Sequence, residues 1–210
     1  MRDEVLAAAR EMLALGLTSG TAGNVSARDG DTVVVTPAGL DYRTMTADDL
    51  VVLSLSGEVL AGDRAPSSER ALHLAAYRAF PEVGGVVHAH PVHATMFACA
   101  RTPIPAAVDE FAIYVGGDVP CAAYAPSGTE ELATEAVRHL GDRGAVLLAS
   151  HGLVTVGLSP ADALHVALVV EQGAHAVWGA AVLGGAVALP SDAQRTLAEH
   201  YRRGRSLPIT

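Results

Sequence analysis

The chain has 210 residues, of which 50% are hydrophobic and 18% charged. This composition is typical of a globular protein with a sizeable core, and it excludes a disordered chain. The net charge of −9 argues against nucleic acid as a partner, because neutralising a phosphate backbone needs a basic surface. It leaves open a small phosphorylated molecule, which a few local donors can hold.

The cysteines and the apolar segments of the sequence indicate the cellular location of the protein. Cys99 and Cys121 are the only cysteines, so no disulfide framework is expected and a reducing cytoplasmic location is predicted. The opening MRDEVLAAAREMLALG has charges within an amphipathic pattern, which is typical of a helix and not of a signal peptide. The longest apolar stretch, residues 161–189, carries acidic residues, histidines and glycines. It predicts a buried core helix and the segment that follows the helix, and it does not predict a membrane partner.

Predicted helices and strands are interspersed without a regular βαβ rhythm, and no repeat or linker divides them. We therefore expect a single α/β domain over residues 1–210, with a mixed sheet and helices on both sides. Helices are predicted over residues 3–15, 68–79 and 128–142, and three more are predicted to begin at residues 91, 160 and 191. Strands are predicted over residues 32–37, 51–55, 86–90, 112–115, 121–124, 145–150 and 153–157.

Several turn and cap signals fix the ends of these elements. Gly16 is expected to end the first helix, and residues 56–59 to form a hairpin turn. Thr129 is a predicted N-cap, and so is Ser159, which precedes a proline at the first helical position. Ser191 and Gln194 have the spacing of a capping box for the last helix.

The stretch GGVVHAHPVH, residues 84–93, places His88 and His90 one residue apart at the end of a short apolar strand. Positions i and i+2 of a strand face the same side, so the two imidazoles are close enough to share an ion. The alternative is a pair of core histidines, but burying two unpaired imidazoles carries a desolvation cost. A metal site needs further ligands.

Two further side chains are candidates for such ligands. His151, in LLASHGLVTVG, sits where one strand ends and is either a core histidine or a third ligand. Glu69, in APSSERALHL, lies at the start of a predicted helix after Ser67 and Ser68. One serine can cap this helix while Glu69 complements its dipole. The second serine is then free, and hydroxyls with backbone N–H groups at a helix start also suit an anion.

The glycine-rich stretch SGTAGNVSARDGD, residues 19–31, follows a helix, whereas dinucleotide and Walker motifs follow a strand. A plain loop is the simplest interpretation. As a functional loop, it would bring the backbone of Gly23 and the amide of Asn24 to a phosphate.

The order of the motifs GTAGNVS, TPAG, PSSE, HAH and HG resembles the class II aldolase/adducin family, and within it the L-fuculose-1-phosphate aldolase branch. The resemblance runs from Leu15 to the final helix. It implies a single α/β domain with a mainly antiparallel nine-stranded sheet flanked by helices. It also implies a homotetramer with zinc sites near the subunit interfaces.

The resemblance assigns roles to individual residues. It implies that His88, His90 and His151 ligate zinc, with cobalt or manganese as other suitable ions, and that Glu69 can bind the ion and act as acid and base. His73 and His93 match no ligand. The implied site for the substrate phosphate comprises Gly23, Asn24, Gly39, Ser67 and Ser68.

The implied reaction is the reversible cleavage of a (deoxy)ketose 1-phosphate, such as L-fuculose 1-phosphate or a 5-deoxypentulose 1-phosphate, to dihydroxyacetone phosphate and a short aldehyde. Zinc would act as a Lewis acid, and Glu69 would transfer the proton at C3. The chain departs from the family pattern at two points. Ala38 stands where the phosphate loop usually has a hydroxyl. The position of an aldehyde-side tyrosine holds Glu110 or Phe111, with Tyr114 out of register, so that acid or base stays unassigned.

Three alternatives use the same fold. A pentulose-5-phosphate 4-epimerase and a methylthioribulose-1-phosphate dehydratase would share the metal site, so the sequence does not separate them from an aldolase. A non-enzymatic, adducin-like interaction module is disfavoured, because all three histidines and Glu69 are present.

Overall fold

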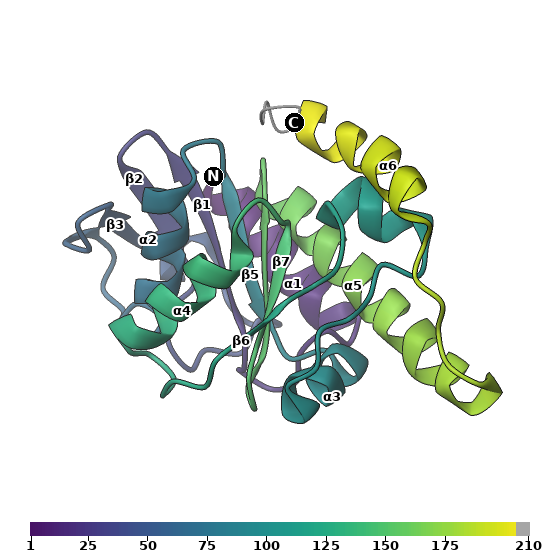
Figure 1. Ribbon diagram of the computed structural model, residues 1–210. Helices are drawn as coiled ribbons and strands as arrows, with labels where there is room; N and C mark the ends of the chain where they lie inside the picture. Colours follow the sequence, from purple (N-terminus) through teal and green to yellow (C-terminus); the bar gives the residue numbers. More distant parts are fainter. Residues whose placement is uncertain (205–210) are drawn as a thin grey trace.

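The structure is a computed structural model that describes residues 1–204. Its middle layer is a sheet with helices on both sides (Figure 1). The sheet has eight strands in the order β4-β3-β2-β1-β5-β8-β7-β6. Neighbouring strands are antiparallel except β6 and β7, which are parallel. The strands are β1 (Asn24–Asp29), β2 (Thr32–Val35), β3 (Val51–Ser54), β4 (Val59–Ala61), β5 (Gly85–Ala89), β6 (Cys121–Ala122), β7 (Ala145–Leu148) and β8 (Gly152–Gly157).

Helices cover both faces of this sheet. Helices α2 and α4 pack together on one face, and α1, α3 and α5 lie on the other (Figure 1). The helical elements are α1 (Arg2–Ala14), η1 (Ala47–Asp49), α2 (Arg70–Ala79), α3 (Val92–Ala100), η2 (Phe111–Val115), α4 (Glu130–Leu140), α5 (Pro160–Ala180), η3 (Ala181–Leu183) and α6 (Ser191–Gly204).

Two apolar cores, one on each face, share the strands between them. In β2, Val34 belongs to the core under α1 and α5, while Val33 and Val35 belong to the core under α2 and α4. This alternation follows from the two-residue period of a strand. The three-layer α/β fold expected from the sequence is therefore confirmed.

Helix α5 is the main helix of one core, as the sequence predicted. By length and composition alone, residues 160–183 are apolar enough to cross a membrane. The helix packs against β5, β8 and α3, and its buried side chains include Leu164, Val166 and Val170. Its start is fixed as expected, because the Ser159 hydroxyl accepts a hydrogen bond from the Asp162 amide at 3.2 Å.

The structure corrects the strand count and two segments. The sheet has eight strands in residues 1–204, not nine, and one of its pairs is parallel. Residues 112–115, predicted as a weak strand, belong to the π-helical segment η2. The apolar run fits either conformation, and burial of Phe111 against α5 selects the helical one. Residues 19–31 were predicted as a loop, but they contain the central strand β1.

Cap predictions were mostly confirmed. Thr129 accepts a hydrogen bond from the Leu132 amide at 3.2 Å, and Gly16 follows α1 with a left-handed φ of 70°. The proposed capping box of the last helix is wrong. Helix α6 begins at Ser191 itself, and Gln194 donates its side-chain N–H to the Leu189 carbonyl at 2.9 Å.

Candidate metal centre and active site

The end of β5 places His88 inside the sheet, where its side chain is fully buried. Its Nδ1 lies 3.0 Å from the carbonyl oxygen of Leu153 on β8. Because a carbonyl oxygen only accepts, Nδ1 carries the hydrogen and donates it. The neighbouring strand therefore fixes both the orientation of the ring and the nitrogen, Nε2, that remains available as a ligand.

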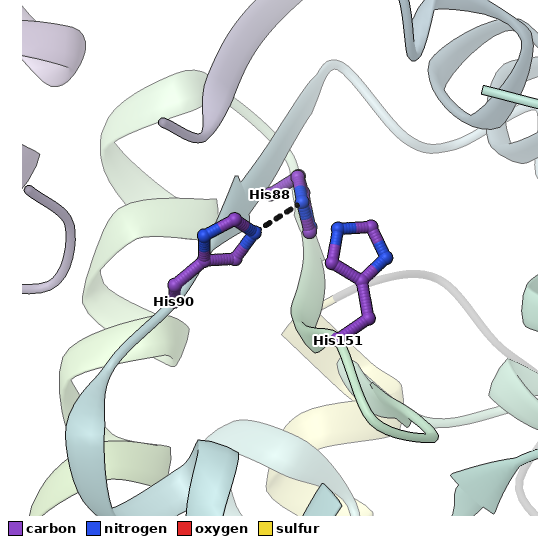
Figure 2. Close-up of side chains that lie close together, drawn as sticks. All are labelled: His88, His90 and His151. Carbon is purple, nitrogen blue, oxygen red and sulfur yellow. Dashed lines mark hydrogen bonds between the residues drawn. The ribbon is translucent and has the colours of Figure 1, made fainter. Parts of the chain in front are cut away.

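The other two predicted histidines meet His88 from different segments. His90 directly follows β5, and its Nε2 lies 2.9 Å from Nε2 of His88. His151 lies in the turn between β7 and β8, where Ser150 adopts a left-handed φ of 57° and donates its N–H to the Ala98 carbonyl at 3.0 Å. The ligand nitrogens of the three histidines lie within 4.8 Å of one another (Figure 2).

Glu69 faces this cluster with both carboxylate oxygens. It directly precedes α2, and its Oε2 lies 3.0 Å from Nε2 of His88 while Oε1 lies 3.4 Å from Nε2 of His151. Two neutral donors hold the carboxylate in place. Asn24 Nδ2 donates to Oε2 at 3.1 Å, and the Ser127 hydroxyl donates to Oε1 at 2.9 Å.

The site favours neutral rings for His90 and His151 and an ionised carboxylate for Glu69. Burial, with the charges of His88 and His151, lowers the pKa of His90 to about 4. Burial and His88 also lower the pKa of His151. Burial raises the pKa of Glu69, but the hydrogen bond and charge of His88, the charge of His151 and the hydrogen bond of Asn24 hold it below its usual range. Neutral imidazoles and a carboxylate are the protonation states that metal binding requires.

The donor set fits a divalent cation. With a hydrogen on Nδ1 donated to Leu153, His88 directs Nε2 toward Oε2 of Glu69 and toward Nε2 of His90. A hydrogen on Nε2 could serve only one of these two neighbours, whereas a metal ion would bind the three imidazoles and the carboxylate together. Three histidines and one carboxylate are a donor set that catalytic zinc sites use, whereas structural zinc sites are mostly built with cysteines.

Two of the segments predicted to bind phosphate, TPAG and PSSE, lie side by side. The Thr36 carbonyl accepts a hydrogen bond from the Ser67 amide at 3.1 Å, and the Ala38 amide donates to the Ala65 carbonyl at 3.0 Å. Ser67 is buried, and its hydroxyl accepts from the Glu69 amide at 3.2 Å. Ser68 is exposed and lines a polar cavity that also contains Arg70 and Gly128.

The remaining predicted phosphate residues have distinct settings. Gly39 has a left-handed φ of 67° and faces open space. The Gly23 carbonyl accepts a hydrogen bond from the Tyr42 hydroxyl at 2.5 Å. The side chain of Asn24 is buried, and it bonds Glu69 through its nitrogen and His73 through its oxygen. Asn24 therefore has a role toward the carboxylate that sequence reasoning did not anticipate.

Sequence reasoning missed two residues near the carboxylate. Ser127 sits in an ordinary-looking APSG turn, and only the fold brings it to Glu69. His73 matches no ligand of the family pattern, yet it lies one helical turn from Glu69 and is 1% exposed. Its spacing of four residues from Glu69, together with the alternating polar residues in NVSAR, is the signal that points to it.

The candidates for the aldehyde side lie around η2. The Tyr114 ring meets His165 edge to face with centroids 4.7 Å apart. Glu110 lines a cavity with Gln172 and Ala176 of α5. Phe111 is buried in the core. None of these contacts joins the three residues to the histidine cluster.

Comparisons with known proteins identify relatives of this chain. Residues 3–178 match the family described as the Class II Aldolase and Adducin N-terminal domain. The 5-methylthioribulose-1-phosphate/5-deoxyribulose-1-phosphate aldolase of Rhodospirillum rubrum is 37% identical over 202 residues, which cover 96% of this chain and 91% of that protein. The 5-deoxy-D-ribulose 1-phosphate aldolase of Bacillus thuringiensis serovar kurstaki is also 37% identical over 202 residues, covering 95% of this chain and 94% of that protein.

Solved structures show the same arrangement of elements. An L-fuculose 1-phosphate aldolase superimposes with a TM-score of 0.92 at 34% identity, covering 96% of this chain and 95% of that chain. The L-fuculose-1-phosphate aldolase of Thermus thermophilus superimposes with a TM-score of 0.77 at 28% identity, covering 89% of this chain and 97% of that chain. The chain belongs to the class II aldolase and adducin family.

Proposed function

We propose that this chain is a metal-dependent aldolase that reversibly cleaves a (deoxy)ketose 1-phosphate to dihydroxyacetone phosphate and a short aldehyde. The observation that carries the proposal is the placement of Glu69, whose two oxygens face three converging histidines at the start of a helix. The named aldolases at 37% identity support the reaction class, and they favour 5-deoxyribulose 1-phosphate as the first substrate to test.

We propose His88, His90, His151 and Glu69 as the residues that would hold the ion, with zinc preferred over cobalt or manganese. When bound, the ion supplies a Lewis acid for the negative charge that develops on the ketose oxygens during cleavage. Leu153 contributes through the hydrogen bond that keeps Nε2 of His88 available.

The substrate phosphate is proposed to bind where the TPAG and PSSE segments lie side by side, with donors from Ser67, Ser68 and the backbone near Gly39. Gly23 and Asn24 complete the proposed phosphate site. Binding a group remote from the reacting bond supplies energy that orients the substrate. Ala38 offers only its backbone to this site.

Glu69 is the proposed acid and base at carbon C3. In cleavage a base on the aldehyde side, to which no residue is assigned, takes the proton of the C4 hydroxyl, and the C3–C4 bond breaks with its electron pair left on C3. Glu69 then gives C3 a proton that it has taken from solvent, which restores the carboxylate. In condensation Glu69 removes that proton. Donors on both oxygens, from Asn24 and Ser127, fix the plane of the carboxylate for this transfer.

The test is to incubate the purified protein with 5-deoxyribulose 1-phosphate, L-fuculose 1-phosphate and the unphosphorylated ketoses, and to assay dihydroxyacetone phosphate. Elemental analysis of the same sample should find close to one divalent ion per chain. Chelation should abolish cleavage, and added zinc should restore it. A protein that releases no dihydroxyacetone phosphate from any 1-phosphate, with its metal in place, would rule the proposal out.

A second candidate substrate is 5-methylthioribulose 1-phosphate, which is favoured by the name of the Rhodospirillum rubrum relative. The same assay separates the outcomes on this fold. Aldol cleavage yields dihydroxyacetone phosphate, dehydration retains all the carbons in one product, and a 4-epimerase would act on a pentulose 5-phosphate.

We further propose a single domain over residues 1–210, a cytoplasmic location and a homotetramer, with neither nucleic acid nor membrane as a partner. Free cysteines and an acidic net charge support the location and the lack of nucleic acid binding. Exposed apolar residues at and after the end of α5, namely Val182, Leu183 and Val187, support self-association. Sedimentation equilibrium tests the tetramer.

A further inference from the structure

A row of buried polar groups leads from Glu69 into the core beneath α2. The Tyr77 hydroxyl lies 2.7 Å from the Ser26 hydroxyl, which lies 2.6 Å from Nδ1 of His73. Nε2 of His73 bonds Oδ1 of Asn24, and Asn24 Nδ2 lies 3.1 Å from Oε2 of Glu69. We call these five residues the polar row.

Elementary geometry explains why these residues meet. On β1, Val25 and Ala27 face the core under α1 and α5, so Asn24 and Ser26 face α2. On α2, His73 and Tyr77 are four residues apart and therefore lie on the same side of the helix. The strand thus presents two polar side chains to two polar side chains of the helix.

The row admits one direction of hydrogen bonding. A carboxylate only accepts, so the amide nitrogen of Asn24 faces Glu69 and its oxygen faces His73. His73 must then carry its hydrogen on Nε2, which leaves Nδ1 to accept from the Ser26 hydroxyl. With its hydrogen given to His73, Ser26 accepts from the Tyr77 hydroxyl.

We propose that His73 is a positioning residue of the aldolase reaction: as the neutral Nε2–H tautomer, it locks the Asn24 amide so that its N–H holds Oε2 of Glu69. This inference rests on the proposed function of Glu69. A flipped amide would turn its oxygen toward the carboxylate oxygen and repel it. Because His73 can donate to an oxygen but not to an NH₂ group, it excludes the flip.

A purely structural role does not require this arrangement. Apolar side chains of similar shape often replace a buried hydrogen-bonded group with little loss of stability. The row instead connects a fully buried imidazole to the one carboxylate that faces three histidines. A positioning role therefore predicts a catalytic effect that is separable from stability.

The first test is the tautomer. Nitrogen-15 NMR of the histidine side chains should show one ring with its hydrogen on Nε2, in slow exchange with water because His73 is 1% exposed. This signal should disappear in His73→Gln, which assigns it. A hydrogen on Nδ1, or a doubly protonated ring, would overturn the inference whether or not the protein proves to be an aldolase.

The second test compares three variants on the ketose 1-phosphate that the wild type cleaves. His73→Leu removes the donor and should lower kcat by roughly tenfold to 100-fold with KM nearly unchanged, because a misplaced carboxylate slows proton transfer. His73→Gln restores an N–H donor toward Asn24 and should recover most of kcat. Thr155→Val is the matched control, since it removes a different buried hydrogen bond, from Thr155 to the Ala163 carbonyl at 2.7 Å.

The outcomes are distinguishable. Wild-type kcat in all His73 variants, or an equal loss in His73→Leu and His73→Gln, would overturn the positioning role. A similar loss in Thr155→Val would show that kcat merely follows stability, which also overturns it. Should His73→Leu not fold, the tautomer and the His73→Gln kinetics still decide the matter. A wild type without aldolase activity would instead refute the proposed function.

Discussion

At the scale of single residues, Glu69 is the side chain on which the proposed chemistry depends. Glu69→Gln is isosteric and keeps an oxygen that can accept from Asn24 or Ser127, so the variant should fold and retain most of its metal. It cannot take up the proton from C3. We expect the exchange of the C3 protons of dihydroxyacetone phosphate in deuterated water to slow by at least about 100-fold. Proton NMR measures this rate, and wild-type exchange in the variant would remove Glu69 from the mechanism.

Gly23 is a second residue with a specific requirement. Its φ is +76°, and a Cβ there would lie 2.7 Å from the carbonyl oxygen of His88. Gly20 also has a left-handed φ, of +60°, but a Cβ there would meet nothing within 4 Å. Gly20→Ala should therefore lower the free energy of unfolding by only about 1–2 kcal/mol, which is the strain of a left-handed backbone at a residue with a Cβ. Gly23→Ala should lower the free energy of unfolding by about 1–3 kcal/mol more than Gly20→Ala does. It should also lower the metal content, because β5, which carries His88, must shift.

Urea unfolding and elemental analysis of both alanine variants check this prediction. Equal losses of stability and full metal content in both would show that the approach to His88 does not matter. The pair separates backbone strain from steric collision, since both positions have positive φ and only one is crowded.

The sequence predicted the metal-binding candidates better than their surroundings. His88, His90, His151 and Glu69 carry residue types whose chemistry is visible in a motif, and the fold brings all four together. His73 and Ser127 carry no such motif, because their importance arises from neighbours distant in the chain. A histidine inside an apolar helix face looks like core until its partners on β1 are known.

At the scale of secondary structure, the strongest patterns were correct and ambiguous ones were decided by packing. The NVSAR segment alternates polar and apolar residues as a strand does, but its glycine-rich surroundings favoured a loop. The apolar run at 112–115 was assigned to a strand, whereas η2 is helical. Short apolar runs fit both conformations, so the partner surface decides between them.

The packing of η2 on α5 gives an element-scale prediction. A Cβ on Gly173 would lie 1.7 Å from Cε2 of Phe111, whereas a Cβ on Gly179 of the same helix would meet nothing within 4 Å. Gly173→Ala should lower the free energy of unfolding by about 1–3 kcal/mol or more. Gly179→Ala should raise it by up to about 1 kcal/mol, because alanine favours the helix.

Thermal unfolding of the two variants measures the difference. About 1 kcal/mol corresponds to roughly 2–4 °C in Tm for a chain of this size, so the two changes should have opposite sign and be resolved. A Gly173→Ala protein as stable as the wild type would show that η2 does not pack on α5 as described.

At the scale of the whole molecule, one sheet supports two cores and one site. Helix α2 contributes to the core on its face, and the same helix carries His73 and Tyr77 of the polar row and begins directly after Glu69. Stability and the site are therefore coupled through buried ionisable groups. We expect this coupling to be visible as a dependence of global stability on pH.

His73 provides the clearest case. Burial lowers the pKa of His73 to about 3, whereas an unfolded histidine titrates near about 6.5. Between these values the unfolded chain binds a proton that the native state does not, so the free energy of unfolding falls as the pH falls. From about pH 7.5 to about pH 5.0 this group alone should remove about 2 kcal/mol. Urea unfolding in the presence of a chelator, which excludes metal binding, measures the loss.

In His73→Gln the loss of stability between the two pH values should be smaller by that amount, since His90 and His151 remain in both proteins and their contributions cancel. His200→Gln, which changes an exposed histidine, should keep the wild-type loss. An equal loss in His73→Gln and in the wild type would show that His73 is not buried as a neutral ring.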